Sequence, residues 1–221
     1  MVRVLLVNPN TTASMTAAIA VSARAAARPT TDVRAINPVD GPVSIENEED
    51  ERRCIPGLLE EVQRAAAADD PPDAYVIACF GDPGLDEVRA AVDVPVLGIA
   101  QAAMHAAALT AGSFSVVTSM SATVPRAWEL AKTYTPARCL GAYASDIPVL
   151  RIDSDPTTID PIGDLCAAAL ARDGSRAIVL GCAAMAKFAA PLTARLGVPV
   201  VDGVVAATLL AEALVGMRRL T

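Results

Sequence analysis

DAYVIACFG, residues 73–81, is a run of apolar and small residues in which a cysteine meets a glycine. A short β-branched run of this kind predicts a buried strand, here over 74–79. The pattern recurs as RAIVLGCAA, residues 176–184, and the two copies align Cys79 with Cys182. An internal duplication, with a cysteine at the end of each copy of the strand, therefore decides how the rest of the chain is interpreted.

The duplication extends to the segments around this strand. VPVLGIAQAA (94–103) has a counterpart in VPVVDGVVAA (198–207), and VLLVNPN (4–10) has a weaker one in FSVVTSM (114–120). Along the chain, short apolar runs alternate with alanine-rich helical stretches, an order that predicts parallel sheets covered by helices on both faces. The predicted fold class is α/β, with two pseudo-symmetric Rossmann-like lobes, mainly parallel sheets and an active site in the cleft between the lobes.

The two expected lobes share the chain unequally. We expect the first lobe to comprise residues 1–98 together with about 204–221, and the second lobe to comprise about 99–203. Ligands of parallel α/β sheets bind beyond the carboxyl ends of the strands. Because both cysteines follow strands of the duplicated pattern, we expect one thiol on each side of a shared cleft.

Composition and charge argue against several classes of partner. The net charge of −7 disfavours nucleic acid and anionic membrane surfaces, since both are bound through basic patches. Residues 94–125 carry no charged side chain, but the run of about twenty apolar residues that a membrane span needs is missing. The N-terminal MVRVLLVNPN turns polar too soon for a signal peptide. We therefore expect a cytoplasmic protein with a small-molecule ligand.

The cysteines are expected to be free and unmetallated. Their number is odd, at positions 54, 79, 139, 166 and 182, and there is no CxxC pair, so disulfides are not expected. A metal site is not expected, because His105 is the only histidine and no two cysteines have ligand spacing. His105 lies in an alanine-rich segment, and we expect it to be a packed or solvent-edge residue of a helix. Cys54, Cys139 and Cys166 have no partner in the repeat and are assigned to packing or the surface.

Two thiols that face each other suit proton transfer at one carbon. A thiolate is a good base, and a predicted helix start after Cys182 favours the ionised thiol. One thiolate can remove a proton while the opposite thiol delivers one to the other face, which inverts the carbon without metal or cofactor. Covalent catalysis would leave one cysteine without a role and would need His105 as its base. A single cysteine at a strand end is more often packing, so the hypothesis depends on the pair.

Other polar residues follow the predicted strands and are expected near the same cleft. NPNTT (8–12) follows the first strand, and its amides and hydroxyls suit a carboxylate or imide oxygen, although a plain turn with a helix cap is an equal alternative. Val43 and Ser44 follow the second strand, and Thr118 ends the strand that opens the second half. Asn10 and Thr118 are the preferred candidates for ligand contact.

These motifs together resemble a known family. NPNT, GPVSIE, VIACFGDPGL, VPVLGI and LGVPVVDGV stand in order and at plausible spacing, and the chain is similar from Val4 to about Val215 to hydantoin racemases, including allantoin racemases, of the aspartate/glutamate racemase superfamily. The resemblance implies an isomerase that needs no cofactor and uses Cys79 and Cys182 as its catalytic pair. It implies 5-monosubstituted hydantoins or allantoin as substrates, and a homo-oligomer.

The resemblance also implies particular substrate contacts. Carried onto the matching motifs, these are Asn10, Val43, Ser44, Gly81 and Thr118, with Phe80 and Ala183 as backbone donors beside the thiols. The chain departs from the family at Ala184, where glycine is common, and the added methyl group is expected to narrow the pocket beside the second thiol. No Arg or Lys occurs in these loops, which suits a ring without a free carboxylate.

Two other functions fit the same features. A superfamily relative of the arylmalonate decarboxylase or maleate isomerase type would act on another acidic carbon; the former manages with one catalytic cysteine, and the latter takes dicarboxylates. A non-catalytic small-molecule-binding protein would use the same two-lobed fold. Malonates and maleate assayed against hydantoins separate the enzymes, and binding without turnover identifies the third class.

Overall fold

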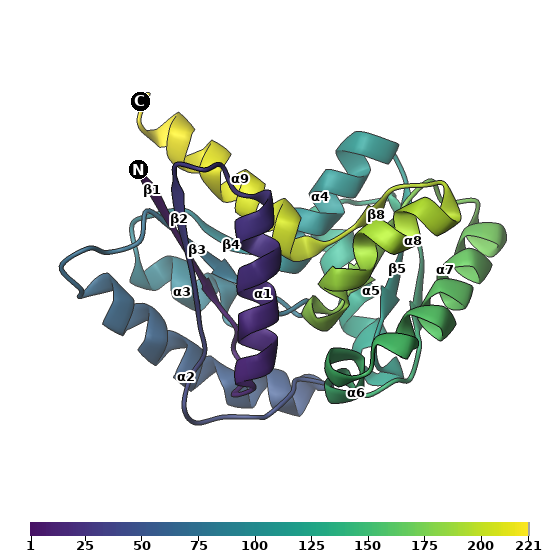
Figure 1. Ribbon diagram of the computed structural model, residues 1–221, viewed down its shortest axis with the longest axis horizontal. Helices are drawn as coiled ribbons and strands as arrows, with labels where there is room; N and C mark the ends of the chain where they lie inside the picture. Colours follow the sequence, from purple (N-terminus) through teal and green to yellow (C-terminus); the bar gives the residue numbers. More distant parts are fainter. Residues whose placement is uncertain (221) are drawn as a thin grey trace.

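The computed structural model describes residues 1–220, and Thr221, the last residue of the expected first lobe, lies outside the described residues. The described chain forms two four-stranded sheets, each flanked by helices, in two lobes that lie side by side (Figure 1). Every strand pairing is parallel. The predicted α/β class with two lobes is confirmed.

The first half of the chain builds the first sheet. Its elements are β1 (Val2–Val7), α1 (Ala13–Ala26), β2 (Thr31–Ile36), α2 (Glu48–Ala66), β3 (Ala74–Ile77), α3 (Leu85–Ala91) and β4 (Val96–Gly98). Along β1, Val4 and Leu6 pack with α1 on one face, whereas Leu5 and Val7 pack with α2 and α3 on the other. This alternation follows from the two-residue period of a strand that is buried on both faces.

The second half of the chain repeats the arrangement. Its α-helices and strands are α4 (Ile99–Ala111), β5 (Phe114–Thr118), α5 (Val124–Tyr134), β6 (Cys139–Ala144), α6 (Val149–Ser154), α7 (Ile159–Asp173), β7 (Ile178–Gly181), α8 (Ala189–Leu196), β8 (Val200–Val201) and α9 (Gly203–Arg218). Short 3₁₀ turns at Ser121–Thr123, Pro156–Thr158 and Ala183–Phe188 precede α5, α7 and α8.

Both sheets have the same strand order. The first is β2-β1-β3-β4 and the second is β6-β5-β7-β8. In register, Val4 of β1 lies beside Ala74 of β3, and Val116 of β5 lies beside Val179 of β7. The strands that carry the duplicated sequence, β3 and β7, therefore hold the same place in the two sheets. The carboxyl ends of the central strands, where ligands bind in such folds, face the region between the lobes.

The two lobes exchange a helix. α4 follows β4 of the first sheet but packs through Ala100, Ala103 and Ala107 against the second sheet. α9 follows β8 of the second sheet but packs through Val204 and Ala207 against the first. α4 and α9 also pack against each other, and their alanines permit the close approach. The division of the chain into 1–98 with about 204–221, and about 99–203, stays a prediction that these contacts favour.

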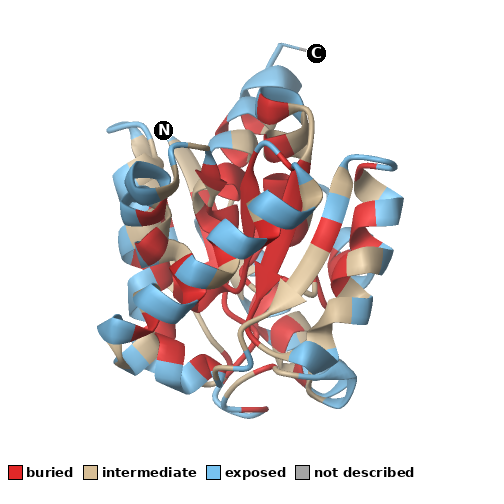
Figure 2. Ribbon diagram, turned by 90° about the vertical axis from the view of Figure 1, so that its right-hand side faces the viewer, coloured by how far each residue is buried: buried red, intermediate tan, exposed pale blue. Residues whose placement is uncertain are grey.

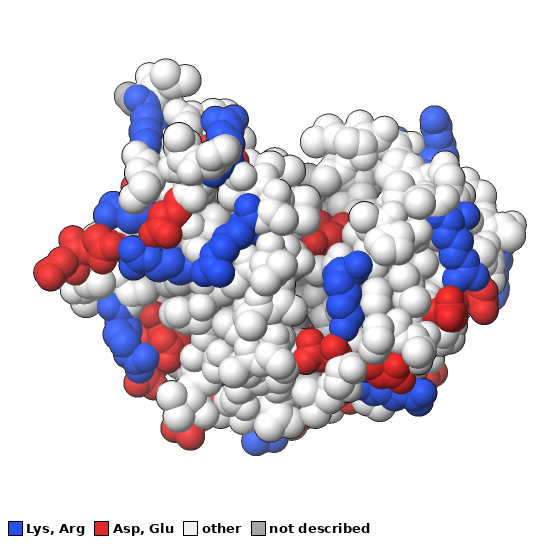
Figure 3. Space-filling view, viewed as in Figure 1, with Lys and Arg blue, Asp and Glu red and all other residues white. Residues whose placement is uncertain are grey.

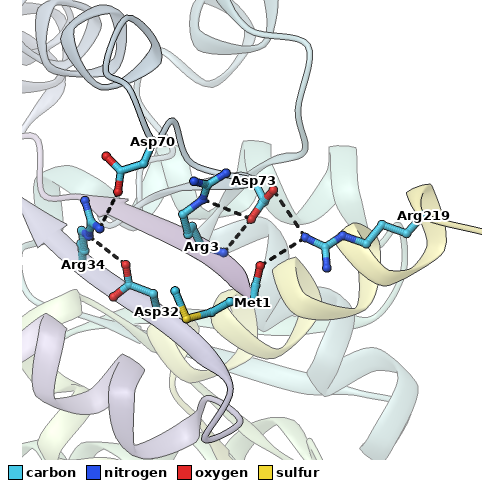
Figure 4. Close-up of polar contacts among 7 residues, drawn as sticks. All are labelled: Met1, Arg3, Asp32, Arg34, Asp70, Asp73 and Arg219. Atoms are coloured by element: carbon cyan, nitrogen blue, oxygen red, sulfur yellow. Dashed lines mark hydrogen bonds and ion pairs between the residues drawn. The ribbon is translucent and has the colours of Figure 1, made fainter.

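A polar cluster fastens the end of α9 to the start of the chain. Arg219 forms an ion pair with Asp73 at 3.5 Å and donates to the carbonyl oxygen of Met1, and the backbone amide of Arg3 donates to Asp73 at 2.8 Å (Figure 4). Beside this cluster, Arg34 bridges two acidic side chains, Asp32 and Asp70 (Figure 4). The two ends of the chain thus meet on the first lobe, away from the carboxyl ends of the strands.

The face of the molecule shown in Figure 3 carries charges of both signs. Among residues 1–220, no helix combines the length and apolarity that crossing a membrane requires. Acidic and basic side chains are interspersed over both lobes with uncharged areas between them (Figure 3). Buried residues are concentrated in the strands and on the inner helix faces (Figure 2).

Two local expectations were wrong. The helix predicted to start after Cys182 does not start there, since residues 183–188 form a 3₁₀ turn and α8 begins only at Ala189. Pro191 explains the break, because proline has no N–H for the carbonyl group four residues earlier and its ring clashes with that carbonyl. The helix α6 was not expected. Its sequence, between Pro148 and Pro156, is too short for a helical period to show.

The junction of α4 and α9 predicts a stability effect. A Cβ atom at Gly203 would lie 2.5 Å from the carbonyl oxygen of Ile99, a backbone atom that cannot rotate away. Gly203→Ala is expected to lower the free energy of unfolding by about 1–3 kcal/mol, measured by urea denaturation. The matched control is Gly216→Ala on the same helix, where a Cβ atom meets nothing within 4 Å. That variant should be unchanged or more stable by about 0.5–1 kcal/mol; equal effects at the two positions would contradict the packing constraint.

Candidate active site

The two cysteines of the repeat lie at equivalent strand ends and line one cavity. Cys79 is two residues beyond β3 and half-buried, and Cys182 follows β7 directly and is buried. The cavity between the lobes has a volume of about 40 Å³. Its lining comprises Asn10, Met15, Ile45, Glu51, Ala78, Cys79, Phe80, Gly81, Thr118, Ser119, Thr123, Arg126, Ala127, Val149, Gly181, Cys182 and Ala183. The strand ends of both sheets thus converge as the parallel topology requires.

Most of the residues expected at the site lie in this lining, and two do not. Asn10, Phe80, Gly81, Thr118 and Ala183 join the two cysteines there. The exceptions belong to the loop after β2. Val43 is 59% exposed, with its carbonyl oxygen bonded by the Thr12 hydroxyl, and Ser44 contacts Glu46 instead. Ile45, the next residue, fills the place expected for them. The roles of all nine residues stay predictions.

Asn10 is held rigidly with a donor left over. Its Oδ1 accepts hydrogen bonds from Nδ2 of Asn8 and from the backbone amide of Thr12, both at 2.9 Å. These bonds fix which end of the amide is which. The Nδ2 atom of Asn10 has only the sulfur of Met15 beside it, at 3.6 Å, and sulfur is a weak acceptor. An NH₂ group in the cavity wall is therefore ready to donate to a ligand oxygen.

Thr118 ties β5 to the strand that carries the second thiol. Its hydroxyl group donates to the carbonyl oxygen of Gly181 at 3.0 Å and lies 2.9 Å from the hydroxyl oxygen of Thr123. A Cβ atom at Gly181 would lie 2.8 Å from the Cβ of Thr118, so only glycine permits this approach. The position of Cys182 is thereby fixed through its neighbour in the chain.

Asp82 anchors the turn that follows Cys79. Its carboxylate accepts from the backbone amides of Ala100 and Gln101, at 3.0 and 2.9 Å, and so caps α4. Burial raises the pKa of this carboxyl group to about 7, although the two amides act in the opposite direction. The turn after Cys79 is thus joined to the helix that crosses to the second lobe.

Burial dominates the electrostatics of both thiols. It raises the pKa of Cys79 well above the ordinary value and that of Cys182 to about 11. The backbone amides of Ala184 and Met185 and the hydroxyl group of Ser119 favour the Cys182 thiolate but do not outweigh burial. The turn after Cys182 therefore favours the thiolate, as the sequence predicts, but this effect on the pKa is smaller than the effect of burial. Burial therefore favours the neutral thiol form of both groups.

Two charged residues of the lining were not expected. Glu51 of α2 and Arg126 of α5 form an ion pair at 3.7 Å, and their side chains are 14% and 39% exposed. Both lie on helices, outside the loops that were searched for charge. The sequence offered one indication, which was their position in the first turn of a helix. A helix that follows a parallel strand starts near the carboxyl edge of the sheet, where the site lies. Among residues 1–220, no group of three or more His, Cys, Asp or Glu side chains is placed to hold a metal ion.

Comparison with known proteins shows which family has this sequence and architecture. Residues 4–211 match the Asp/Glu/Hydantoin racemase family. The chain belongs to that family. A hydantoin racemase of Rhizobium meliloti is 44% identical over 213 residues, covering 96% of this chain and 88% of that protein. Membership confirms the expected isomerase of the racemase type.

Solved structures of family members share the whole architecture. An allantoin racemase from Klebsiella pneumoniae superposes with a TM-score of 0.94 at 42% identity, covering 99% of this chain and 89% of that one. An allantoin racemase from Pseudomonas fluorescens gives a TM-score of 0.92 at 36% identity, with 98% and 92% covered. The two-lobed arrangement is therefore that of the racemase family.

The raised pKa values predict how the thiols react with iodoacetamide. Only the thiolate is nucleophilic, so at a pH below the pKa the rate at Cys182 should rise by about tenfold per pH unit between pH 7 and pH 9. Peptide mass spectrometry after timed alkylation measures this rate. Cys166, which is fully buried on α7, should stay unmodified in the folded protein. A rate at Cys182 that is already constant above pH 7 would contradict the burial effect.

Proposed function

We propose that this chain is a cofactor-independent racemase of 5-monosubstituted hydantoins, a class that includes allantoin as a ureido-substituted hydantoin, and that it works by two-base proton transfer at C5. The observation that carries the proposal is the pair of thiols, Cys79 and Cys182, which reach one cavity from equivalent ends of two duplicated sheets. Relatives named hydantoin racemase and allantoin racemase support the same substrate class.

In the proposed reaction, the two cysteines exchange roles. One thiolate takes the C5 proton, and the electron pair of the C–H bond moves into the ring as an enolate, with the charge on the adjacent carbonyl oxygen. The opposite thiol then delivers its proton to the other face of C5 and becomes the thiolate. The product is the mirror image of the substrate. Because the proton has moved from one cysteine to the other, reaction in the reverse direction starts from the opposite thiolate.

The enolate oxygen needs hydrogen-bond donors that are already in place. The Nδ2 group of Asn10 has only the weak sulfur acceptor of Met15 among the described residues, and the two hydrogen bonds to Oδ1 fix its position. We assign to it a role in binding the ring or stabilising the enolate, together with the backbone amides of Phe80 and Ala183. Thr118, whose hydroxyl proton is donated to Gly181, is assigned a contact with the ring through its oxygen atom, as an acceptor. Donors held rigidly before the reaction cost no reorganisation while charge develops. Val43 and Ser44 stay proposed contacts through their loop, of which Ile45 lines the cavity.

Arg126 is the observation that favours the second candidate, an enzyme for carboxylate substrates. A guanidinium in the cavity wall could bind a carboxylate. Its Nε and Nη2 atoms, however, already donate to the carbonyl oxygen of Gly81, and Glu51 neutralises its charge. A neutral imide ring suits this balanced site better than a dicarboxylate. Malonates and maleate are therefore expected to give no turnover under conditions in which hydantoins racemise.

The cellular setting of the proposed enzyme is a proposal as well. All five cysteines are free, which suits the reducing conditions of the cytoplasm. A homo-oligomer is proposed from the resemblance to family members.

Removing either thiol tests the two-base mechanism. Cys79→Ala and Cys182→Ala are each expected to lower kcat for loss of optical rotation by about 10²–10⁴-fold, because each removes one proton-transfer group. Polarimetry on a single enantiomer of a 5-substituted hydantoin measures the loss. Cys166→Ala, a buried cysteine away from the cavity, is the control and should keep the wild-type rate. Racemisation at the wild-type rate by either the Cys79→Ala or the Cys182→Ala variant would contradict the two-base mechanism.

The space for the 5-substituent does not depend on Ala184. This residue is buried among the apolar side chains of the second lobe, with Leu180 and Met185, and it is absent from the cavity lining. The expectation that its methyl group narrows the pocket is therefore wrong for this geometry, since the side chain points into the core. Its neighbour Ala183 does line the cavity.

The two neighbouring alanines predict opposite outcomes. Ala184→Gly should leave the preference between a small and a large 5-substituent unchanged and lower the free energy of unfolding by about 1 kcal/mol. Ala183→Gly, with an equal change of composition, should enlarge the cavity and shift the ratio of kcat/KM values toward the larger substituent. Polarimetric kinetics on two hydantoins measures the ratio. A shift for Ala184→Gly alone would reverse the assignment.

A further inference from the structure

Arg126 holds the turn that carries Cys79 from across the cleft. It lies on α5, which packs on β6 and α4, whereas Gly81 belongs to the turn after β3 of the first sheet. Its Nε and Nη2 atoms donate to the carbonyl oxygen of Gly81 at 3.1 and 3.0 Å. Two bonds to one oxygen fix both the distance and the angle of the contact. The acceptor is only two residues from the thiol.

Glu51 closes the same contact from the other side. A Cβ atom at Gly81 would lie 2.0 Å from Oε1 of Glu51, so the carboxylate rests against the turn, and it pairs with Arg126 at 3.7 Å. Glu51 and Arg126 lie between the inner cavity and an outer groove of about 480 Å³, since both residues line both spaces. The turn is thus clamped between an acid of α2 and a base of α5.

The start of α5 is itself tied to the other thiol. Thr123, immediately before α5, places its hydroxyl oxygen 2.9 Å from that of Thr118, and Thr118 donates to the carbonyl oxygen of Gly181, next to Cys182. A continuous chain of contacts therefore runs from the turn of Cys79 through Arg126 and α5 to the strand end of Cys182. A two-base reaction needs both sulfur atoms aligned with C5 at the same time.

We propose that Arg126 is a positioning residue that holds Cys79 opposite Cys182, so that proton removal on one face is matched by proton delivery on the other. The inference rests on the proposed function and deepens it. Without this contact, the turn of Cys79 keeps its tie to α4 through Asp82 but loses its direct tie to α5, while Cys182 stays fixed by Gly181 and Thr118. An enolate formed by Cys182 would then take a proton back from Cys182 and return to the starting enantiomer. In D₂O, where the Cys182 thiol exchanges its proton with solvent before the return, C5 gains deuterium without inversion.

The experiment separates proton exchange from inversion. Each enantiomer of a 5-substituted hydantoin is incubated in D₂O with wild type, Arg126→Gln or Arg126→Lys, and C5 deuterium uptake is compared with loss of optical rotation after subtracting the enzyme-free rates. With either variant, kcat for inversion should fall on the order of 100-fold, as expected for misplaced reacting groups. For one enantiomer only, uptake with retained configuration should exceed inversion.

Arg89 supplies a closely matched control. Its Nε and Nη2 atoms also donate to a single carbonyl oxygen, that of Val96, at 3.3 and 3.1 Å. Like Arg126, it has a 39% exposed side chain and a neighbouring acid on its own helix at 3.4 Å. Its contacts lie outside the cavity lining. Arg89→Lys and Arg89→Gln should keep the wild-type ratio of uptake to inversion, and urea denaturation of all variants checks that the Arg126 variants are folded.

The outcomes distinguish the two proposals. If the wild-type protein racemises but the Arg126 variants keep its ratio of uptake to inversion for both enantiomers, the positioning role is wrong and the racemase proposal stands. The same holds if the Arg89 variants change the ratio as much. If the wild-type protein neither inverts nor exchanges C5 of any hydantoin, the proposed function fails and the positioning role fails with it.

Discussion

The close approach of α4 and α9 is the constraint on which the rest of the structure depends. Each helix begins directly after the edge strand of one sheet and packs on the other sheet, so their junction sets how the sheets face each other. At the junction, Gly203 lies so near Ile99 that a side chain would meet a backbone oxygen. Because the core is close-packed and aromatic residues are only 3% of the chain, this spacing is set by backbone and alanine contacts with few adjustable side chains. The opposed positions of Cys79 and Cys182 follow from it.

The small size of the cavity both favours and opposes the proposed chemistry. A volume of about 40 Å³ holds few waters, which strengthens each hydrogen bond to an enolate. The same dryness raises the pKa of both thiols and so disfavours the thiolate that must start the reaction. The backbone amides after Cys182 recover part of that cost. A substrate whose C5 proton is acidified by a ring carbonyl demands less of the base, which fits the site better than an unactivated carbon.

Period and duplication in the sequence were enough for the fold and for the convergence of the two thiols. Alternation along the chain predicts parallel sheets, and the repeat predicts that Cys79 and Cys182 occupy like positions. The sequence did not predict details of the site that depend on the path of a loop or on contacts between residues far apart in the chain. Whether Val43 or Ile45 faces the cavity is decided by the path of one loop. The proposed role of Arg126 depends on its hydrogen bonds to the carbonyl oxygen of Gly81, forty-five residues away in the chain. No local sequence pattern predicts such a contact.

The two halves differ most in how they cap the exchanged helices, and this difference bears on the thiols. In the repeat, Gly98 before α4 corresponds to Asp202 before α9. Asp202 caps its own helix, accepting from Val204 at 2.9 Å. At Gly98 a side chain would lie 2.1 Å from the carboxyl carbon of Asp82, which caps α4 instead. Each exchanged helix is therefore capped by a carboxylate, but the two carboxylates, Asp82 and Asp202, come from different places in the repeat. In the second half, the cap does not come from the turn of Cys182, which meets α9 through the packing of Ala183 against Val204 and Ala207. In the first half, Asp82 binds the turn of Cys79 to α4 by two hydrogen bonds, so that the cap of this helix and the position of the first thiol depend on the same side chain.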